Sequence, residues 1–358
     1  MVANRDRRAV LNVQYPIIQA PMAGGTTTPA LVAAVSNAGG LGSLGAAYLT
    51  PEQITAAVAA IRELTDRPFN VNLFAGGYAT TSDVDPEPML ATLGRFHAEL
   101  QLPPPVLPAL ARDPFPEQIE AVLAARPPVF SFTFGLPDRA ALSRLKERGI
   151  TVIGTATTVE EARQLAAAGV DAIVAQGSEA GAHRGTFAAP FEAALIGTMA
   201  LVPQVVDAVS VPVVASGGIM DGRGIYAALA LGASAVQMGT AFLMCQEAAT
   251  PAAHRAAIRS ASAEQTTITR AFSGRPARGL VNQLIRTVHE QPETILPFPL
   301  QNSLTRQLRA AAAERGNPEY LSLWAGQAAP LGRELPAAEL VATLVAETRR
   351  AAERALPF

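Results

Sequence analysis

The sequence predicts an α/β protein: a (β/α)8 TIM barrel with a long insertion after the third strand and a mostly helical C-terminal extension. Apolar, β-prone runs recur through the first 243 of the 358 residues, and helix-like segments of about 10 to 20 residues separate most of them. Charged residues make up only 16% of the chain and hydrophobic ones 49%, which suits a large core. Several of the runs are continuous rather than alternating, as expected for strands buried on both faces. The eight expected strands are Pro16–Met22, Leu41–Gly45, Phe69–Phe74, Val129–Phe134, Ile150–Ala156, Ala172–Gly177, Pro212–Gly218 and Ala235–Leu243.

The expected helix starts agree with this register. Thr50 to Gln53 and Thr158 to Glu161 have the spacing of capping boxes, the first with a proline at the first helical position. Thr28-Pro29 and Asp221 place a capping side chain before two more helices. Eight strand–helix units ending near residue 243 span about 230 residues, close to the usual length of a barrel.

Two regions exceed a minimal barrel. Residues 75–128 form a Pro-rich insertion, and residues 244–358 form the helical extension, so we expect a cofactor-binding barrel over 1–243, insertion included, and an extension packed on it. The last expected helix, 336–355, predicts packing on the barrel or on a second subunit, which leaves a homodimer open. Its apolar face comprises Leu340, Val341, Leu344, Val345 and Thr348.

Composition and charge exclude several classes of protein. Lys and Arg number 28 against 30 Asp and Glu, a net charge of -2 without a basic stripe, so nucleic acid is not an expected partner. The single cysteine, Cys245, excludes an intramolecular disulfide framework and a CxxC centre. The uncharged stretches 9–51 and 225–246 are interrupted by Gly, Pro, Asn or Gln too often for a membrane-spanning helix, and no cleavable signal is evident. We expect a cytoplasmic protein with no membrane association.

Two glycine-rich loops follow the seventh and eighth expected strands. They read SGGIMDGRG (Ser216–Gly224) and QMGT (Gln237–Thr240). In a barrel these loops commonly hold phosphate groups, because glycine lets backbone N–H groups approach an anion and a following helix adds partial positive charge. Gly217 and Gly218 would otherwise serve only a tight turn, but glycines in both adjacent loops favour a phosphate-bearing ligand.

The segment Gly40–Gly45 also matches GxGxxG, the pattern of dinucleotide-binding loops. That motif requires a strand before it and a helix directly after it. Here a helix comes before and a loop follows. The segment is therefore interpreted as a helix end that runs into the second strand, and it gives no support to a nicotinamide cofactor.

The loop after the sixth expected strand, Gly177–Gly185, surrounds His183 with small residues. Its position at a strand end on the catalytic face of a barrel favours a functional imidazole over a merely solvated one, as general acid, general base or donor to an anion. The remaining histidines, His97, His254 and His289, form no metal-spaced cluster with it. No metal site is predicted.

Two amide side chains lie at apolar strand positions. Asn72 is inside the third expected strand and Gln176 ends the sixth. A buried amide without a hydrogen bond costs about 1–3 kcal/mol, and the C=O and N–H edge of a heterocycle would satisfy it. Pairing between amides inside the barrel is the alternative.

Taken together, these motifs resemble the flavin-dependent nitronate monooxygenases, formerly called 2-nitropropane dioxygenases. The insertion and the segment Leu323–Gln327 look like the branch related to the bacterial and fungal enzymes. The matching stretches are PIIQAPMAGG (16–25), NAGGLGSLGA (37–46), RPFNVNLF (67–74), AQGSEAGAHRG (175–185), VPVVASGGIMDGRG (211–224) and ALGASAVQMGTAFL (230–243).

The resemblance implies one non-covalent FMN per barrel and the active-site histidine at His183. The phosphate would lie on Gly217, Gly218, Gly239 and Thr240. The flavin ring and ribityl chain would contact Ala20, Pro21, Met22, Asn72, Gln176 and Gly181, with Gln237 and Met238 completing the last loop.

The resemblance also implies the reaction. The substrate would be an alkyl nitronate such as propionate 3-nitronate, oxidised with O2 to a carbonyl compound and nitrite. Some relatives carry a second histidine where this chain has Thr133, which leaves activity on neutral nitroalkanes open. The alternatives are an NAD(P)H-dependent flavin reductase acting on quinones or enoyl thioesters, and a non-catalytic flavin- or phosphate-binding protein.

Overall fold

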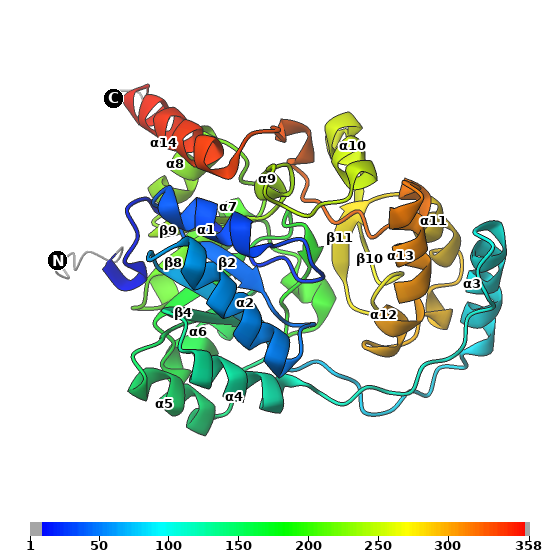
Figure 1. The fold of residues 1–358 in the computed structure, drawn as a ribbon. Helices are drawn as coiled ribbons and strands as arrows, with labels where there is room; N and C mark the ends of the chain where they lie inside the picture. Colours follow the sequence, from blue (N-terminus) through cyan, green and yellow to red (C-terminus); the bar gives the residue numbers. More distant parts are fainter. Residues whose placement is uncertain (1–8, 355–358) are drawn as a thin grey trace.

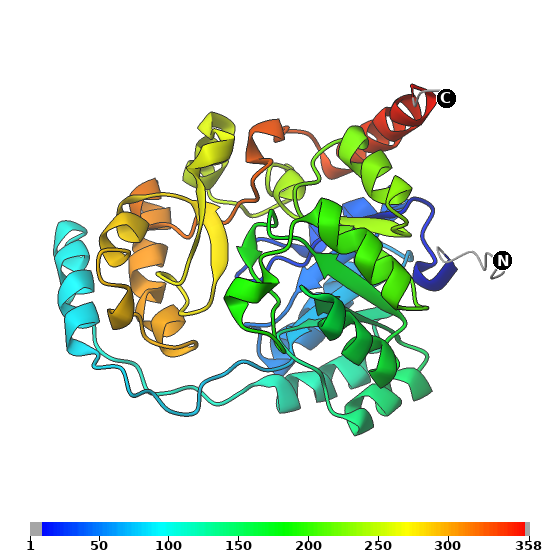
Figure 2. The ribbon, with the colours of Figure 1, turned by 180° about the vertical axis from the view of Figure 1, so that it is seen from behind.

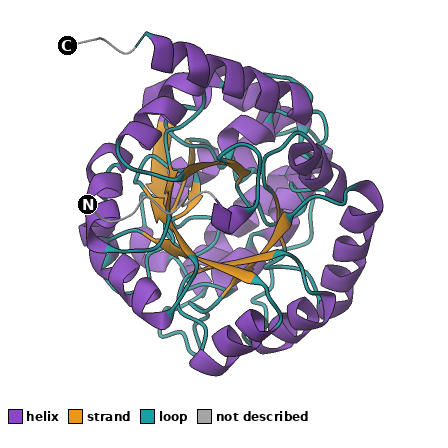
Figure 3. Cartoon of the chain, turned by 90° about the vertical axis from the view of Figure 1, so that its left-hand side faces the viewer, coloured by secondary structure: helices purple, strands orange, loops and turns teal. Residues whose placement is uncertain are grey.

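A computed structural model describes residues 9–354 and contains the predicted barrel. Its eight strands are parallel and follow the order β1-β9-β8-β6-β5-β4-β3-β2. The barrel closes between β1 and Leu41, where the Gln19 N–H donates to the Leu41 carbonyl at 2.9 Å (Figure 3). The strands are β1 (Ile17–Gln19), β2 (Gly42–Gly45), β3 (Phe69–Phe74), β4 (Val129–Thr133), β5 (Thr151–Ala156), β6 (Ala172–Gln176), β8 (Val213–Ser216) and β9 (Ala235–Met238).

Helices connect these strands and cover the outside of the barrel (Figure 1). They are α1 (Pro29–Asn37), α2 (Pro51–Leu64), α4 (Phe115–Ala125), α5 (Arg139–Glu147), α6 (Val159–Ala168), α7 (Thr198–Ala208) and α8 (Gly222–Ala230). The predicted N-caps are confirmed. Both capping boxes close in both directions, and Thr28 and Asp221 accept hydrogen bonds from the first turns of α1 and α8.

One strand prediction is partly wrong. Residues 235–243 do not form one strand, because β9 ends at Met238 and a short helix, α9 (Thr240–Leu243), begins after Gly239. A continuous apolar run is equally compatible with a buried strand and a buried helix, so periodicity could not place this change. The segment Gly40–Gly45 lies, as predicted, between the end of α1 and β2.

The barrel interior is filled at its amino end and open at its carboxyl end. At the amino end, large apolar side chains pack against Leu11 of the short helix η1 (Ala9–Leu11). They come from successive strands and include Ile18, Val129, Ile153, Val174 and Val214. The helices pack against the outer faces of the strands in a separate, larger core. The barrel interior therefore leaves room for a ligand toward the carboxyl end of the strands.

The extension and part of the insertion share a second core. It joins α3 (Glu87–Glu99) to the helices that follow the barrel, and both ribbon views show α3 beside them (Figures 1 and 2). The helices are α10 (Ala252–Ser260), α11 (Gln283–Val288), α12 (Leu300–Leu304) and α13 (Arg306–Glu314). Beside them, β10 (Thr266–Thr269) and β11 (Ala277–Leu280) form a sheet with β7 (Ala182–His183), which lies in the barrel loop after β6. Short 3-10 helices occur at Phe191–Ala194, Ala263–Gln265, Pro292–Thr294, Pro318–Tyr320 and Ala329–Leu331.

Two helices, one from the expected insertion (75–128) and one from the expected extension (244–358), pack on the barrel. The helix α4 takes the crossover position between β3 and β4, so only residues 75–114 leave the barrel. At the other end of the chain, α14 (Ala337–Glu353) returns to pack on α8 and α1. Its buried residues include Leu340, Val341 and Leu344, so its apolar face covers the barrel, one of the two expected alternatives. Over residues 9–354, no helix is both long and apolar enough to cross a membrane.

Candidate active site

A cavity of about 630 Å³ opens at the carboxyl ends of the barrel strands. Residues of the extension, among them Ser273, Asn302 and Trp324, form its outer wall. The structure brings every residue predicted for the site to this cavity: Ala20, Pro21, Met22, Asn72, Gln176, Gly181, His183, Gly217, Gly218, Gln237, Met238, Gly239 and Thr240. Their roles toward a cofactor remain predictions.

The two glycine loops offer backbone donors to the cavity. Gly217 and Gly218 have φ values of 117° and 70°, which favour glycine. Within residues 9–354, the N–H groups of Gly217, Gly218 and Gly239 donate no hydrogen bond. Unpaired N–H groups in adjacent loops suit the oxygens of a phosphate.

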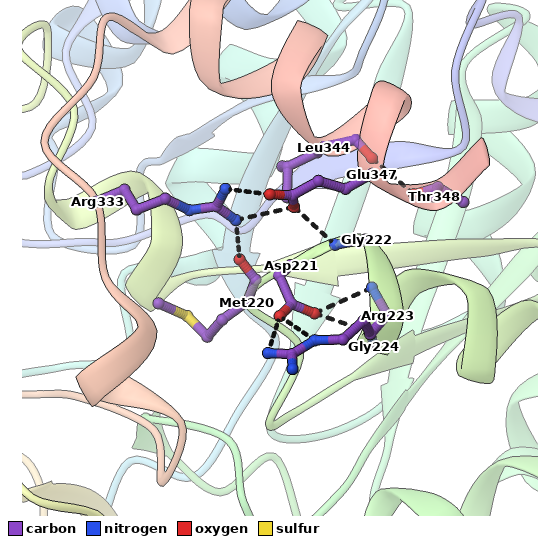
Figure 4. A network of polar contacts seen from close by, with 9 residues as sticks. All are labelled: Met220, Asp221, Gly222, Arg223, Gly224, Arg333, Leu344, Glu347 and Thr348. Carbon is purple, nitrogen blue, oxygen red and sulfur yellow. Dashed lines mark hydrogen bonds and ion pairs between the residues drawn. The ribbon is translucent and has the colours of Figure 1, made fainter. Parts of the chain in front are cut away.

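The amino end of α8, by contrast, is already occupied by carboxylates. Asp221 accepts from the N–H groups of Arg223 and Gly224 at 3.0 and 3.1 Å, and Glu347 of α14 accepts from the N–H of Gly222 at 3.1 Å (Figure 4). These side chains compensate the partial positive charge of the helix. The N–H groups of the first turn of α8 are therefore not available to a phosphate, which would depend on the glycine loops.

The Gln176 side chain holds the histidine loop in place. Its Nε2 donates to the carbonyl of His183 at 3.0 Å, and its Oε1 accepts from the N–H of Gly185 at 2.8 Å. Arg184, 2% exposed, donates to the carbonyls of Gln176 and Ala194 at 3.1 and 3.0 Å. The Gln176 amide is therefore satisfied inside the protein, but by backbone groups and Arg184 and not by a second amide side chain.

Asn72 differs, because half of its amide stays free. Its Nδ2 donates to Ser131 Oγ at 2.9 Å, but its carbonyl oxygen has no partner among residues 9–354. The side chain is 4% exposed and lines the cavity. A ligand with an N–H edge would satisfy this acceptor.

His183 lies at the edge of the extension's sheet, where β7 pairs with β11. Its Nε2 is 2.8 Å from Ser273 Oγ, while Nδ1 has no partner in the described part of the chain. The rings of Phe74, Phe134 and Trp324 surround the imidazole at centroid distances of 6.1, 5.5 and 5.8 Å. The single Ser273 proton has two possible acceptors, because the hydroxyl oxygen also lies 3.2 Å from the carbonyl oxygen of Arg275. When Ser273 donates to Nε2, Nδ1 carries the imidazole proton and is a donor for a ligand; when Ser273 donates to Arg275, Nε2 carries it and Nδ1 is an acceptor.

This setting keeps the imidazole neutral. Burial, with smaller contributions from the charges of Arg275 and Arg309, lowers the pKa of His183 to about 3. A neutral imidazole both accepts and donates a hydrogen bond, but with so low a pKa it is a weak base for removing a proton from carbon.

The site contains cationic residues that the sequence reading missed. Arg306 and Arg309 of α13 line the cavity with Tyr48, and Arg275 contacts the cavity wall, its Cζ 3.8 Å from the ring centroid of Phe134. Burial lowers the pKa of Arg275 and of Arg309 to about 10, so both remain charged at neutral pH. No Asp or Glu lines the cavity within residues 9–354. The wall is therefore suited to an anion.

Weak signals for these residues exist in the sequence. Arg306 and Arg309 are three residues apart, which places them on one face of a helix. Trp324 and Gly326 on the cavity wall belong to the segment Leu323–Gln327, which carried part of the family resemblance. No group of three or more His, Cys, Asp or Glu side chains suited to a metal ion occurs over residues 9–354.

The pKa of His183 makes stability depend on pH. The folded state keeps the imidazole neutral down to a pKa of about 3, whereas the unfolded chain protonates it near 6.5, so the unfolded state binds more protons between these values. We expect the free energy of unfolding of the ligand-free protein to fall as pH falls through this window, by about 1–2 kcal/mol from pH 6.5 to 5 for this residue alone.

Urea unfolding of wild type and His183→Asn across this pH range measures the effect. The variant should lose less stability on acidification than wild type. Equal slopes in the two proteins would contradict the buried neutral imidazole.

The fold and the site together define a protein of the (β/α)8-barrel class with a cavity suited to an anion. Comparison with known proteins sharpens this class. The family model of nitronate monooxygenase matches residues 6–347. A probable nitronate monooxygenase of Staphylococcus saprophyticus is 44% identical over 347 residues, which cover 96% of this chain and 98% of that protein.

Solved structures agree. The nitroalkane oxidase of Streptomyces ansochromogenes superposes with a TM-score of 0.91 at 42% identity, covering 97% of this chain and 99% of that one. FabK from Thermotoga maritima gives 0.76 at 31% identity, covering 97% and 96%. The chain belongs to the nitronate monooxygenase family and is an oxidoreductase.

Proposed function

We propose that the protein uses FMN to oxidise alkyl nitronates with O2, giving a carbonyl compound and nitrite. The observation that carries the proposal is the charge of the cavity: Arg306 and Arg309 line it, no acidic residue does, and the imidazole beside them is neutral. A nitronate is a small anion and matches that wall. The family to which the chain belongs supports the oxidation of nitro compounds.

The residues present fit FMN. The unpaired N–H groups of Gly217, Gly218 and Gly239 would hold its phosphate, and the free carbonyl of Asn72 would accept from the ring edge. When bound, the flavin supplies the electron acceptor for the oxidation. Residues Ala20 to Met22 on the cavity wall would lie along the ring.

The chain's own residues favour a nitronate over a neutral nitroalkane. A neutral nitroalkane requires a base that removes the α-proton, and an imidazole with a pKa of about 3 does this poorly. Thr133, where some relatives have a second histidine, lines the cavity beside Thr155, their hydroxyl oxygens 3.4 Å apart, and supplies no base. In the tautomer that carries its proton on Nδ1, His183 would instead donate to the nitronate oxygens.

Turnover assays under air test this assignment. Nitrite release and O2 uptake are measured with propionate 3-nitronate, ethylnitronate and nitroethane, each at matched concentration. We expect rapid turnover of the nitronates and little of nitroethane. Faster turnover of nitroethane, or reduction of a quinone that depends on NADH or NADPH without nitronate turnover, would contradict the proposal; the second result would favour the flavin reductase.

A further inference from the structure

The C-terminal helix α14 is tied to the loop that follows β8. Arg333 and Glu347 form a two-bonded ion pair with N–O distances of 2.7 and 3.1 Å (Figure 4). The same two side chains continue to the loop: Arg333 Nη2 donates to the carbonyl of Met220 at 3.2 Å, and Glu347 Oε2 accepts from the N–H of Gly222 at 3.1 Å. The pair therefore holds the backbone on both sides of Asp221.

The ion pair is ordered by its surroundings. The side chains of Arg333 and Glu347 are only 28% and 26% exposed. In the ion pair of Arg286 and Glu319, the corresponding exposed fractions are 58% and 42%. Although burial opposes ionisation, the hydrogen bonds from Arg333 and Gly222 lower the pKa of the Glu347 carboxyl. Partly buried, two-bonded arginine–carboxylate pairs are geometrically specific.

The close approach of α14 to the loop requires a glycine at position 222. A Cβ on Gly222 would lie 2.3 Å from Glu347 Cβ and 2.3 Å from the backbone nitrogen of Thr348, so a side chain at this position would push α14 away. On the other side of the same short segment, Ile219 and Met220 line the cavity next to Gly217 and Gly218. One stretch of backbone thus contacts α14 outside and the cavity inside.

We propose that Arg333 and Glu347 are positioning residues for the cofactor phosphate: they fix residues 219–222 so that the N–H groups of Gly217 and Gly218 stay aimed at it. Donors fixed in advance bind an anion without an ordering cost. This inference rests on the proposed use of FMN. It assigns the last helix of the extension to cofactor binding, although no residue of α14 lines the cavity.

The test compares two flavins in a charge-neutral double variant. The double variant Arg333→Gln, Glu347→Gln removes the ion pair without changing the net charge, and so leaves no buried charge unpaired. Fluorescence titration of the flavin-free protein should give an FMN Kd about tenfold above wild type, the effect of one weakened hydrogen bond to a charged group. The Kd of riboflavin, which lacks the phosphate, should not change.

A matched control uses the pair Arg259 and Glu334, which are 3.2 Å apart, are more exposed, and bond to no part of the loop. Its Gln/Gln double variant should bind both flavins as wild type does. An unchanged FMN Kd in the Arg333/Glu347 double variant would overturn the proposal. Equal loss of affinity for both flavins would overturn it too, because it would indicate a general loss of structure. Wild-type protein that binds neither flavin would instead refute the proposed function, and with it the positioning role of Arg333 and Glu347.

Discussion

Replacement of His183 by asparagine is expected to lower kcat for a nitronate by about two to three orders of magnitude while leaving the FMN Kd unchanged. The imidazole lies on the cavity wall among the rings of Phe74, Phe134 and Trp324, and its Nδ1 is free for a ligand. The smaller asparagine donates from a different position and loses the contact with Ser273. Steady-state turnover and flavin titration measure the two effects separately.

The variant Ser273→Ala provides the matched comparison. Ser273 Oγ lies 2.8 Å from Nε2 and holds the orientation of the imidazole, so its loss should lower kcat by a smaller factor, about tenfold. Wild-type turnover in His183→Asn would remove His183 from the mechanism. A larger effect for Ser273→Ala than for His183→Asn would mean that the hydroxyl, and not the imidazole, meets the substrate.

Removal of positive charge from α13 is expected to weaken binding of the anionic substrate. Arg309→Gln should lower kcat/KM for a nitronate by about two orders of magnitude, mostly through KM, and Arg306→Gln by about one. Arg309 is the more enclosed and also donates to the carbonyl and the Oδ1 of Asn302, at 2.8 and 2.9 Å. Arg306 makes no hydrogen bond through its guanidinium within the described residues, so its variant reports charge alone.

The control for these variants is Arg315→Gln, which removes an exposed arginine at the end of the same helix and away from the cavity. It should leave kcat/KM unchanged. Increasing salt should raise the wild-type KM for nitronate and affect Arg309→Gln less. An equal loss of kcat/KM in Arg309→Gln and Arg315→Gln, or a wild-type KM that salt does not alter, would contradict binding of the anion by the charge of the cavity wall.

Local patterns were sufficient for the barrel and for the side of the site that the barrel builds. Buried strands such as Ala172–Gln176 begin with continuous apolar runs, and helix starts such as Thr50 carry their caps in neighbouring residues. Because the carboxyl ends of parallel strands meet at one face, residues that follow different strands, such as His183 and Gly217, could be assigned to one site.

The outer wall could not be predicted in this way. Ser273 and Arg309 reach the cavity only through packing of the extension, and no local pattern specifies that contact. Phe134 and Ala182 on the cavity wall have φ values of 74° and 60°. Non-glycine residues seldom adopt such values, so they could not be predicted from the residue types. For Gln176, the strand pattern indicated a buried amide but not which partner it would find.

The central claim is that this barrel binds FMN and that a nitronate reduces it. The most direct test is the absorption spectrum of the purified protein, followed by anaerobic titration with propionate 3-nitronate and, separately, with NADH and NADPH. We expect a flavin spectrum that nitronate bleaches and that the nicotinamide nucleotides leave unchanged. Colourless protein that FMN does not reconstitute, or bleaching by NADH or NADPH but not by nitronate, would contradict the account.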